Sequence, residues 1–258
     1  MKESINKTFN HFKIHTQYSI CEGAVKIEQL KDFCKKNKIK SLGLSDTYNL
    51  SGALEFSENL SSVGTQPIIG TQILFKYKGF NGLIPLIAKN YNGYKNIIKL
   101  SSKSYLDNLE TTSPFCELED LLNNSDGIII LTGSVKCLFG SLFNKGLFDE
   151  IEEILIKLKA KFEENMYIEI QRHNDLNEKH FENYNLKISE KLELPIIASN
   201  EVYYLDQDMF DAHDALMCIG EKNYVNDSNR IKLTNQHYFK SSEEMIELFK
   251  DLPEALEN

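Results

Sequence analysis

The chain has 258 residues, of which 41% are hydrophobic, and carries a formal net charge of −9. It is long enough to bury one large core, and its acidic balance excludes a surface that binds nucleic acid through clustered lysine and arginine. Five scattered cysteines without a Cys-x-x-Cys pair exclude a disulfide framework and a zinc knuckle, and no apolar run has the length of a membrane span, so we expect a cytoplasmic protein without membrane contact.

Short apolar runs alternate with amphipathic segments along the chain, a pattern typical of βα units. We predict strands near 10–15, 41–45, 67–75, 82–88, 127–132, 166–171 and 195–199. We predict helices near 25–37, 50–61, 91–105, 147–163, 177–191, 206–219 and 242–249, the last opening with a capping box of Ser241 and Glu244. In the helix near 147–163, one face carries Phe148, Ile151, Leu155, Leu158 and Phe162. The pattern favours a single domain over residues 1–258, an α/β fold with a closed or nearly closed seven-stranded barrel.

Polar side chains follow the predicted strands, where barrel enzymes place their functional groups. Taken singly, each is most simply a turn or cap residue. Taken together, two histidines and three carboxylates resemble the ligands of a divalent metal. The rim positions are His15, Glu22, Asp46, Gln72, Ser134, His173, Asn200 and Glu201.

Five residues at or beside the rim weaken the interpretation as a metal site. A protonated Lys13 cannot ligate a cation and would repel one, while Thr47, Gln72, Ser134 and Tyr203 are poor ligands for zinc or manganese. A multi-metal phosphoesterase uses its metals to make hydroxide and to clamp phosphate. A site that has lost half of its metal ligands is therefore expected to have lost phosphoesterase activity. If the acids Glu22, Asp46 and Glu201 still cluster, we expect the Lys13 amine within salt-bridge range of at least one of them.

Two weaker patterns have structural interpretations. Ser19 could pair with His15 as nucleophile and base, but no Gly-x-Ser-x-Gly turn supports this pairing. Asp211, His213 and Asp214 lie in a predicted helix, and we interpret them as an acid-rich first turn. No phosphate-binding loop of the Walker or dinucleotide type occurs in the sequence.

Seven sequence blocks resemble, in order, the amino-terminal PHP (polymerase and histidinol phosphatase) domain of bacterial DNA polymerase III alpha subunits. They include "FKIHTQYSICEGAVKIEQL", "LGLSDTYNLSGALEF", "YIEIQRHN", "LPIIASNEVYYLDQDMFDAHDALMCIG" and "YFKSSEEMIELFKDLPEALEN". The blocks cover nearly the whole chain. The resemblance implies a distorted, TIM-like PHP barrel and a chain that ends just before the polymerase palm.

The resemblance also assigns the rim positions. In metal-binding members, histidines stand where this chain has Lys13, Thr47 and Tyr203, and an acid stands where it has Gln72. The retained positions are His15, Asp46 and His173, with Glu22 and Glu201 as acid-for-acid replacements. The resemblance therefore implies a vestigial site with no catalytic residue, and neither zinc nor manganese is expected there.

The resemblance implies a catalytically silent scaffold that docks the proofreading exonuclease, the epsilon subunit, and braces the palm of the same chain. The parent polymerase would use Mg²⁺ and deoxynucleoside triphosphates, and DNA would be contacted only through the rest of that protein. A metal-dependent phosphoesterase or 3′–5′ exonuclease at the barrel rim is the alternative. A free-standing phosphatase of the histidinol-phosphate type is disfavoured by the polymerase-type blocks.

Overall fold

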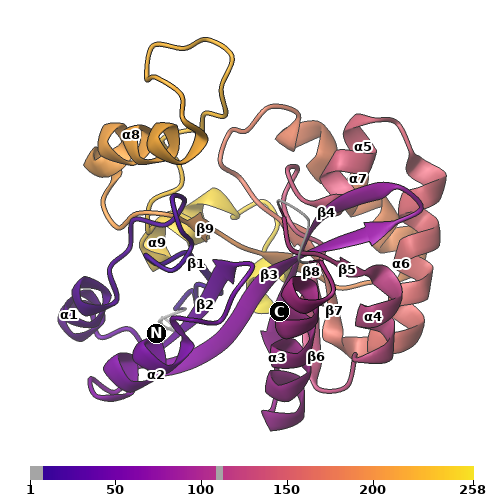
Figure 1. Cartoon of the computed structure of the whole chain (residues 1–258), viewed down its shortest axis with the longest axis horizontal. Coiled ribbons are helices and arrows are strands. Elements are labelled where there is room, and N and C mark those ends of the chain that lie inside the picture. Colours follow the sequence, from indigo (N-terminus) through magenta and orange to yellow (C-terminus); the bar gives the residue numbers. More distant parts are fainter. Residues whose placement is uncertain (1–7, 109–112) are drawn as a thin grey trace, which may run out of the picture.

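The computed structural model describes residues 8–108 and 113–258, which form one strongly curled, mixed sheet with helices packed around it (Figure 1). The sheet order is β8-β7-β6-β4-β3-β2-β1-β9, and the short β5 pairs with β3. The strands are β1 Lys13–Ile14, β2 Ser41–Thr47, β3 Gln66–Tyr77, β4 Phe80–Ala88, β5 Cys116–Glu117, β6 Ile128–Leu131, β7 Met166–Ile170, β8 Ile196–Ala198 and β9 Glu201–Val202.

The two edges of this sheet are joined by one segment, 196–202. Its first half, β8, pairs in parallel with β7, and its second half, β9, pairs in parallel with β1. The amide of Ser199 donates to the carbonyl of Ile170 (3.0 Å), and the amide of His15 donates to the carbonyl of Val202 (2.9 Å). The predicted distorted α/β barrel is confirmed, and its seventh strand is split between the two neighbours.

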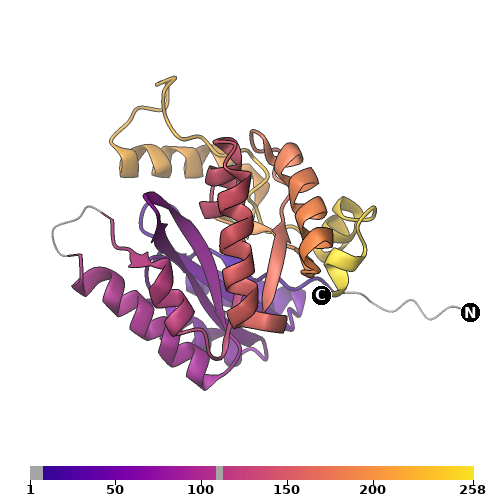
Figure 2. The ribbon, with the colours of Figure 1, turned by 90° about the vertical axis from the view of Figure 1, so that its right-hand side faces the viewer.

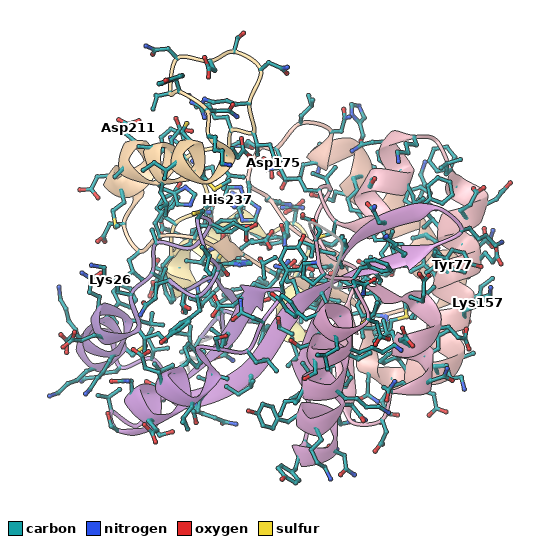
Figure 3. The ribbon with its side chains drawn as sticks, in the orientation of Figure 1. Lys26, Tyr77, Lys157, Asp175, Asp211 and His237 are labelled. Atoms are coloured by element: carbon teal, nitrogen blue, oxygen red, sulfur yellow. The ribbon has the colours of Figure 1, made fainter. Side chains whose placement is uncertain are left out.

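Strands β3 and β4 form an antiparallel hairpin, and the sequence pattern predicted no helix between these two strands. Their register pairs Tyr77 with Phe80, and the two residues between them, Lys78 and Gly79, have φ values of 48° and 84°. Positive φ at both turn positions matches the right-handed twist of a tight hairpin, and two residues cannot make a parallel crossover. The hairpin end is tied to helix α6 (Phe148–Phe162), because Tyr77 lies between Glu153 and Lys157 (2.7 and 2.6 Å; Figure 3).

All seven predicted helices are present, with α6 and α7 side by side along one flank of the sheet (Figure 2). On α6 the predicted apolar face is buried except for Phe148, which is 46% exposed. The sequence analysis missed α4, α5 and α10, which have too few turns for a clear period. The helices are α1 Ile27–Asn37, α2 Ala53–Ser61, α3 Tyr91–Leu106, α4 Leu118–Asn123, α5 Leu138–Asn144, α6, α7 Glu178–Leu192, α8 Phe210–Glu221, α9 Ser242–Leu248 and α10 Glu254–Glu257.

The predicted capping box at the start of α9 is also present. The hydroxyl of Ser241 accepts from the amide of Glu244 (3.2 Å), whose carboxylate accepts from the amide of Ser241 (2.7 Å). These two bonds satisfy donors that a helix start leaves free. Across residues 8–108 and 113–258, no helix combines the length and the apolar character needed to cross a membrane.

Candidate functional site

The side chain of Lys13 lies at the centre of the barrel rim. Strand β1 pairs Lys13 with Glu201 of β9, and the lysine is 1% exposed. Its Nζ lies 3.1 Å from Oε1 of Glu201 and 3.2 Å from Oε1 of Glu169 on β7. Burial opposes a charged lysine, but the charges of Glu169 and Glu201 outweigh it and raise the pKa of Lys13. The predicted ion pair with one of the rim acids is therefore present, with Glu201.

The carboxylate of Glu201 gathers three partners on one oxygen. Besides Lys13, its Oε1 lies 2.6 Å from the amide nitrogen of Gln72 and 3.2 Å from Nε2 of His15. Burial alone would raise the pKa of Glu201, but Lys13, His15 and Gln72 hold it well below its ordinary value. Glu201 is thus ionised, and its Oε1 atom already has three polar neighbours.

The other three positions that the family pattern marks as lost ligands surround His15. The Gln72 amide nitrogen lies 3.1 Å from Nε2 of the imidazole, and the Thr47 hydroxyl lies 3.5 Å from Nδ1. The Tyr203 ring stacks on it at 4.3 Å between centroids. Burial and the charge of Glu201 raise the pKa of Tyr203 well above its ordinary value, so the phenol is neutral. Lys13 and these three side chains form one cluster with His15 and Glu201, in which every member is buried except the partly exposed Tyr203.

Asp46 holds the loop that follows β1. Its carboxylate accepts from the amide and hydroxyl of Thr16 (2.6 and 2.7 Å) and from the hydroxyl of Ser19 (2.9 Å). Burial raises the pKa of Asp46, and these hydrogen bonds oppose the rise. Nδ1 of His15 lies 3.2 Å from the Ser19 hydroxyl, but Ser19 donates its proton to Asp46, so His15 does not take that proton as a base would. The Ser19–His15 pairing is therefore structural.

Glu22 lies at the edge of the same rim. Its backbone carbonyl accepts from Nε2 of His213 (2.6 Å), which ties α8 to the β1 loop, and its charge contributes to the raised pKa of Tyr203. Asp214 forms a two-pronged pair with Arg230 (both contacts 2.6 Å), while Asp211 is exposed. These contacts agree with a structural role for the helix acids.

His173 lies beside the Lys13 cluster and meets it through the backbone of Glu201. Its Nε2 lies 3.0 Å from Oδ1 of Asn200 and 3.2 Å from the amide nitrogen of Glu201. Its ring stacks on His237 at 4.1 Å between centroids. Burial, together with the nearby charge of Lys240, holds the pKa of His173 well below its ordinary value, so the imidazole is neutral. The structure therefore separates His173 from His15 and places it in a second group with His237.

Sequence reasoning missed Glu169, the second carboxylate on Lys13. It accepts from Ser199 and from the amide of Gln171 (2.6 Å). The available signal was a single charged residue inside the apolar strand "MYIEI". Asp175 and His237 were also missed, and no spacing in the sequence connects them to the rim.

The Lys13 cluster does not fit a divalent ion. A charged lysine occupies the space between Glu169 and Glu201, and the Gln72 amide presents a hydrogen-bond donor to Glu201 where a ligand would present a lone pair. An ammonium repels a metal cation, and amide N–H groups do not coordinate one. What this cluster can do is hold three strands together through buried charge.

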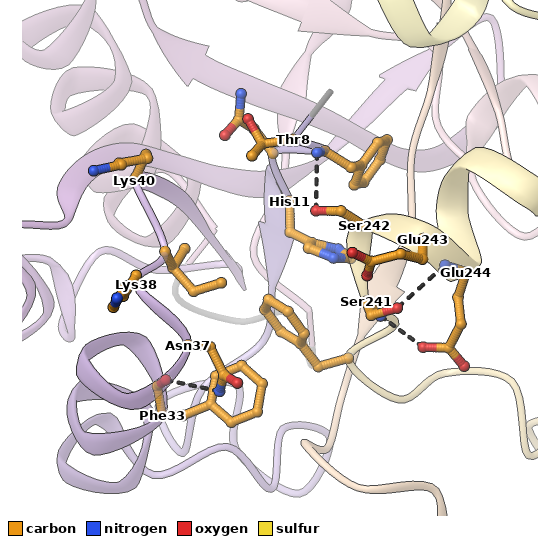
Figure 4. A pocket seen from close by; sticks show the side chains of 14 residues that line it. Thr8, His11, Phe33, Asn37, Lys38, Lys40, Ser241, Ser242, Glu243 and Glu244 are labelled. Atoms are coloured by element: carbon orange, nitrogen blue, oxygen red, sulfur yellow. Dashed lines mark hydrogen bonds between the residues drawn. The ribbon is translucent and has the colours of Figure 1, made fainter. Parts of the chain in front are cut away.

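A separate cavity of about 420 Å³ opens between the end of α1 and the start of α9 (Figure 4). Its lining includes Phe33, Lys38, Phe239 and Ser242, whose hydroxyl accepts from the amide of Phe9 (3.1 Å). No residue of the Lys13 cluster lines it. The cavity therefore plays no part in the candidate site.

Comparison with known proteins identifies the class first: the PHP domain family matches residues 11–173, and the chain belongs to that family. Within it, the chain is 34% identical to the DNA polymerase III subunit alpha of Caulobacter vibrioides, over 100% of this chain and 23% of that protein. It is likewise 34% identical to the subunit of the same name from Borreliella burgdorferi, over 99% of this chain and 23% of that protein.

A solved structure supports the fold. An amidohydrolase from Chromobacterium violaceum aligns with a TM-score of 0.50 and 10% identity, covering 81% of this chain and 96% of that one. The predicted resemblance to DNA polymerase III alpha subunits is confirmed. The chain spans about a quarter of the length of those curated relatives.

Proposed function

We propose that this chain is a single, catalytically silent PHP domain that acts as a scaffold within a bacterial replicative polymerase. In this role it docks the proofreading exonuclease subunit and braces the polymerase palm, while DNA synthesis with Mg²⁺ belongs to the rest of the parent protein. A cytoplasmic location is part of the same proposal.

The observation that carries this proposal is the ion pair of Lys13 with Glu201 and Glu169 at the rim. In a phosphoesterase the same place needs a metal that generates hydroxide and clamps phosphate oxygens. A lysine ammonium does neither of these tasks, and Asp46 is engaged by the loop of Thr16 and Ser19. The likeness to DNA polymerase III alpha subunits over the whole chain supports the replicative setting.

A rim phosphoesterase or 3′–5′ exonuclease remains the second candidate, and one observation favours it. His173, Asp175 and His237 bring ligand atoms within 4.8 Å of one another, close to the vestigial positions. The two candidates differ in turnover, because only an enzyme hydrolyses phosphate esters or shortens DNA.

Hydrolysis assays test the scaffold proposal directly. The purified chain is supplied with Zn²⁺ or Mn²⁺ and assayed on p-nitrophenyl phosphate and on a labelled single-stranded oligonucleotide, and we expect no turnover above the buffer blank. Turnover that disappears in His237→Ala or in His15→Ala, with the variant still folded, would establish the enzyme candidate and overturn the scaffold.

Binding to the cognate proofreading subunit tests the docking role. We expect a one-to-one complex in sedimentation velocity, with the same affinity for wild type and His15→Ala, because docking does not use rim chemistry. A chain that stays separate from the exonuclease at concentrations well above those of the cell would remove the docking role.

A further inference from the structure

His173 and His237 form a stacked, buried pair beside the Lys13 cluster, and each turns one ring nitrogen toward a carboxylate. The rings are nearly parallel, at 6°, and each residue is 1% exposed. Nε2 of His237 lies 3.6 Å from Oδ2 of Asp175, and Nδ1 of His173 lies 3.5 Å from Oε1 of Glu178. Figure 3 shows Asp175 and His237 next to one another.

When the His237 ring is neutral, its hydrogen lies on Nδ1 and the lone pair of Nε2 faces a carboxylate. Its Nδ1 lies 3.1 Å from the backbone carbonyl of Glu201, and a carbonyl only accepts, so this nitrogen carries the hydrogen. In the neutral ring, Nε2 is then a lone pair directed at Asp175. Two acceptors that face each other in a buried site repel unless a cation lies between them.

His173 also turns a ring nitrogen toward a carboxylate, while its other nitrogen is held by Asn200 and by the Glu201 amide. The amide of Asn200 is oriented by its donation to the Tyr238 carbonyl (2.9 Å) and by Lys240 on its oxygen (3.2 Å). Nε2 of His173 accepts from the Glu201 amide (3.2 Å), so the neutral ring carries its hydrogen on Nδ1, which faces Glu178. A metal ion at Nδ1 would move that hydrogen to Nε2, where Oδ1 of Asn200 lies 3.0 Å away and can accept it. Among the described residues, Nδ1 of His173, Nε2 of His237 and Oε1 of Glu178 have no hydrogen-bond partner.

The second oxygens of both carboxylates are already anchored. Oδ1 of Asp175 pairs with Lys136 (2.6 Å), and Oε2 of Glu178 accepts from the amides of His173 and Asn174 (2.7 Å each). The free oxygens are therefore held in place and aimed at the two imidazoles. In metal sites of proteins, the ring nitrogen and the carboxylate oxygen that do not bind the metal are usually hydrogen-bonded, and these bonds hold the ligands in position.

We propose that His173, Asp175 and His237, with Glu178 beside them, bind one divalent transition-metal ion, for which zinc is the best match. Two imidazoles with carboxylate oxygens suit zinc, and tetrahedral ligands at about 2.1 Å from the ion lie roughly 3.4 Å apart. The distances of 3.5 and 3.6 Å between the facing atoms are close to that separation. Three of these four residues lie outside the rim positions that the family pattern marks.

The role of the ion is structural. It ties the loop after β7, which carries His173 and Asp175, to the strand-like segment around His237, which β9 contacts through Glu201. Lys136 pairs with Oδ1 of Asp175 and so neutralises part of the acid charge at the site, while Lys240 donates to Asn200. Burial lowers the pKa of Lys240 to about 8, so the Lys240 amine loses its proton, and with it its charge, in mildly alkaline solution.

Metal titration of the purified chain tests the site. After treatment with a chelator and dialysis, elemental analysis should find one bound zinc after Zn²⁺ is added back, Tm should rise with zinc concentration, and Co²⁺ should give visible bands typical of a tetrahedral site. His237→Gln and Asp175→Asn should each weaken binding by at least about tenfold.

Two matched variants locate the ion. His213→Gln removes another buried histidine that donates to a backbone carbonyl, and His15→Gln removes the histidine of the Lys13 cluster. Both should keep the bound zinc, with folding checked by circular dichroism. Absence of zinc on the folded wild-type chain, or its loss in His15→Gln with retention in His237→Gln, would overturn the proposal. A bound zinc without hydrolysis leaves the scaffold function intact, so the two proposals fail separately.

Discussion

The Nζ atom of Lys13 and Oε1 of Glu201 lie 3.1 Å apart in a nearly dry environment, at residues paired across β1 and β9. Glu169 adds a second buried carboxylate at 3.2 Å from the same ammonium. Without the lysine, two buried acids would face one another with no cation between them. The ammonium thus supplies the positive charge that lets these two carboxylates lie close together in a buried place.

Replacing Lys13 with methionine should strongly destabilise the fold. Methionine keeps much of the volume but leaves Glu169 and Glu201 buried without their cation, and breaking a buried pair in this way costs about 3–5 kcal/mol. Urea unfolding followed by circular dichroism measures the loss. The matched control is Lys78→Met, since Lys78 pairs with Glu153 on the exposed surface and should change stability little. Equal losses in the two variants would show that the buried pair has no special weight.

Restoring the four replaced ligands should create a metal site in the Lys13 cluster. The variant Lys13→His/Thr47→His/Gln72→Glu/Tyr203→His removes the ammonium and surrounds His15 with lone-pair donors, which suit zinc or manganese. Elemental analysis should find at least one metal equivalent more than in the wild-type chain, and adding His15→Gln should remove it. A folded quadruple variant with no additional metal would mean that strand positions, and not only ligand identity, have diverged.

The sequence was sufficient to predict a barrel-like sheet, because each main strand is a short apolar run. Helices such as α6 were predictable because their apolar residues recur with the period of a helix. The sequence did not show that β4 runs antiparallel, since an apolar run carries no direction and Lys78-Gly79 is a weak turn signal. A pairing of Lys13 with at least one of Glu22, Asp46 and Glu201 was predictable from their places at strand ends on one rim, and Glu201 is the partner. Glu169 and His237 were not predictable, because tertiary packing of distant segments brings them to the site.

Acidic pH should destabilise the protein through His11. This residue is 2% exposed, its Nε2 lies 2.9 Å from the carbonyl of Lys240, and burial lowers its pKa from 6.5 to about 4. The unfolded chain binds the proton first as pH falls, so stability that is present above pH 6.5 is lost on the way to pH 4.

The size of this loss can be isolated with His11→Gln. Between about pH 7.5 and pH 5 the His11 contribution to the free energy of unfolding should fall by about 2 kcal/mol. Urea unfolding at both pH values should therefore show a larger drop for wild type than for His11→Gln. Parallel drops in the two proteins would mean that His11 titrates normally in the folded state.

Arg172 should be the main electrostatic link between α7 and the segment after α9. Its guanidinium forms paired contacts with Glu182 (3.0 and 2.8 Å) and with Asp251 (2.6 and 3.0 Å), and it donates to the carbonyl of Leu248 (2.6 Å). The carboxylates of Asp251 and Glu182 raise the pKa of Arg172 although its partial burial opposes this.

Arg172→Ala should lower the free energy of unfolding by about 2 kcal/mol, because it leaves the nearly buried Glu182 with only Lys179 and frees the Leu248 carbonyl. Arg172→Lys should recover only part of that loss, since an ammonium cannot make both planar, two-pronged contacts. Lys179→Ala is the matched control, because Lys179 pairs with the same Glu182 from an exposed position and should matter little. Thermal unfolding ranks the stability of the three variants, and limited proteolysis near Asp251 reports whether the segment after α9 detaches. If Arg172→Lys were as stable as wild type, a positive charge alone, without the planar paired contacts of the guanidinium, would be enough to hold α9 against α7.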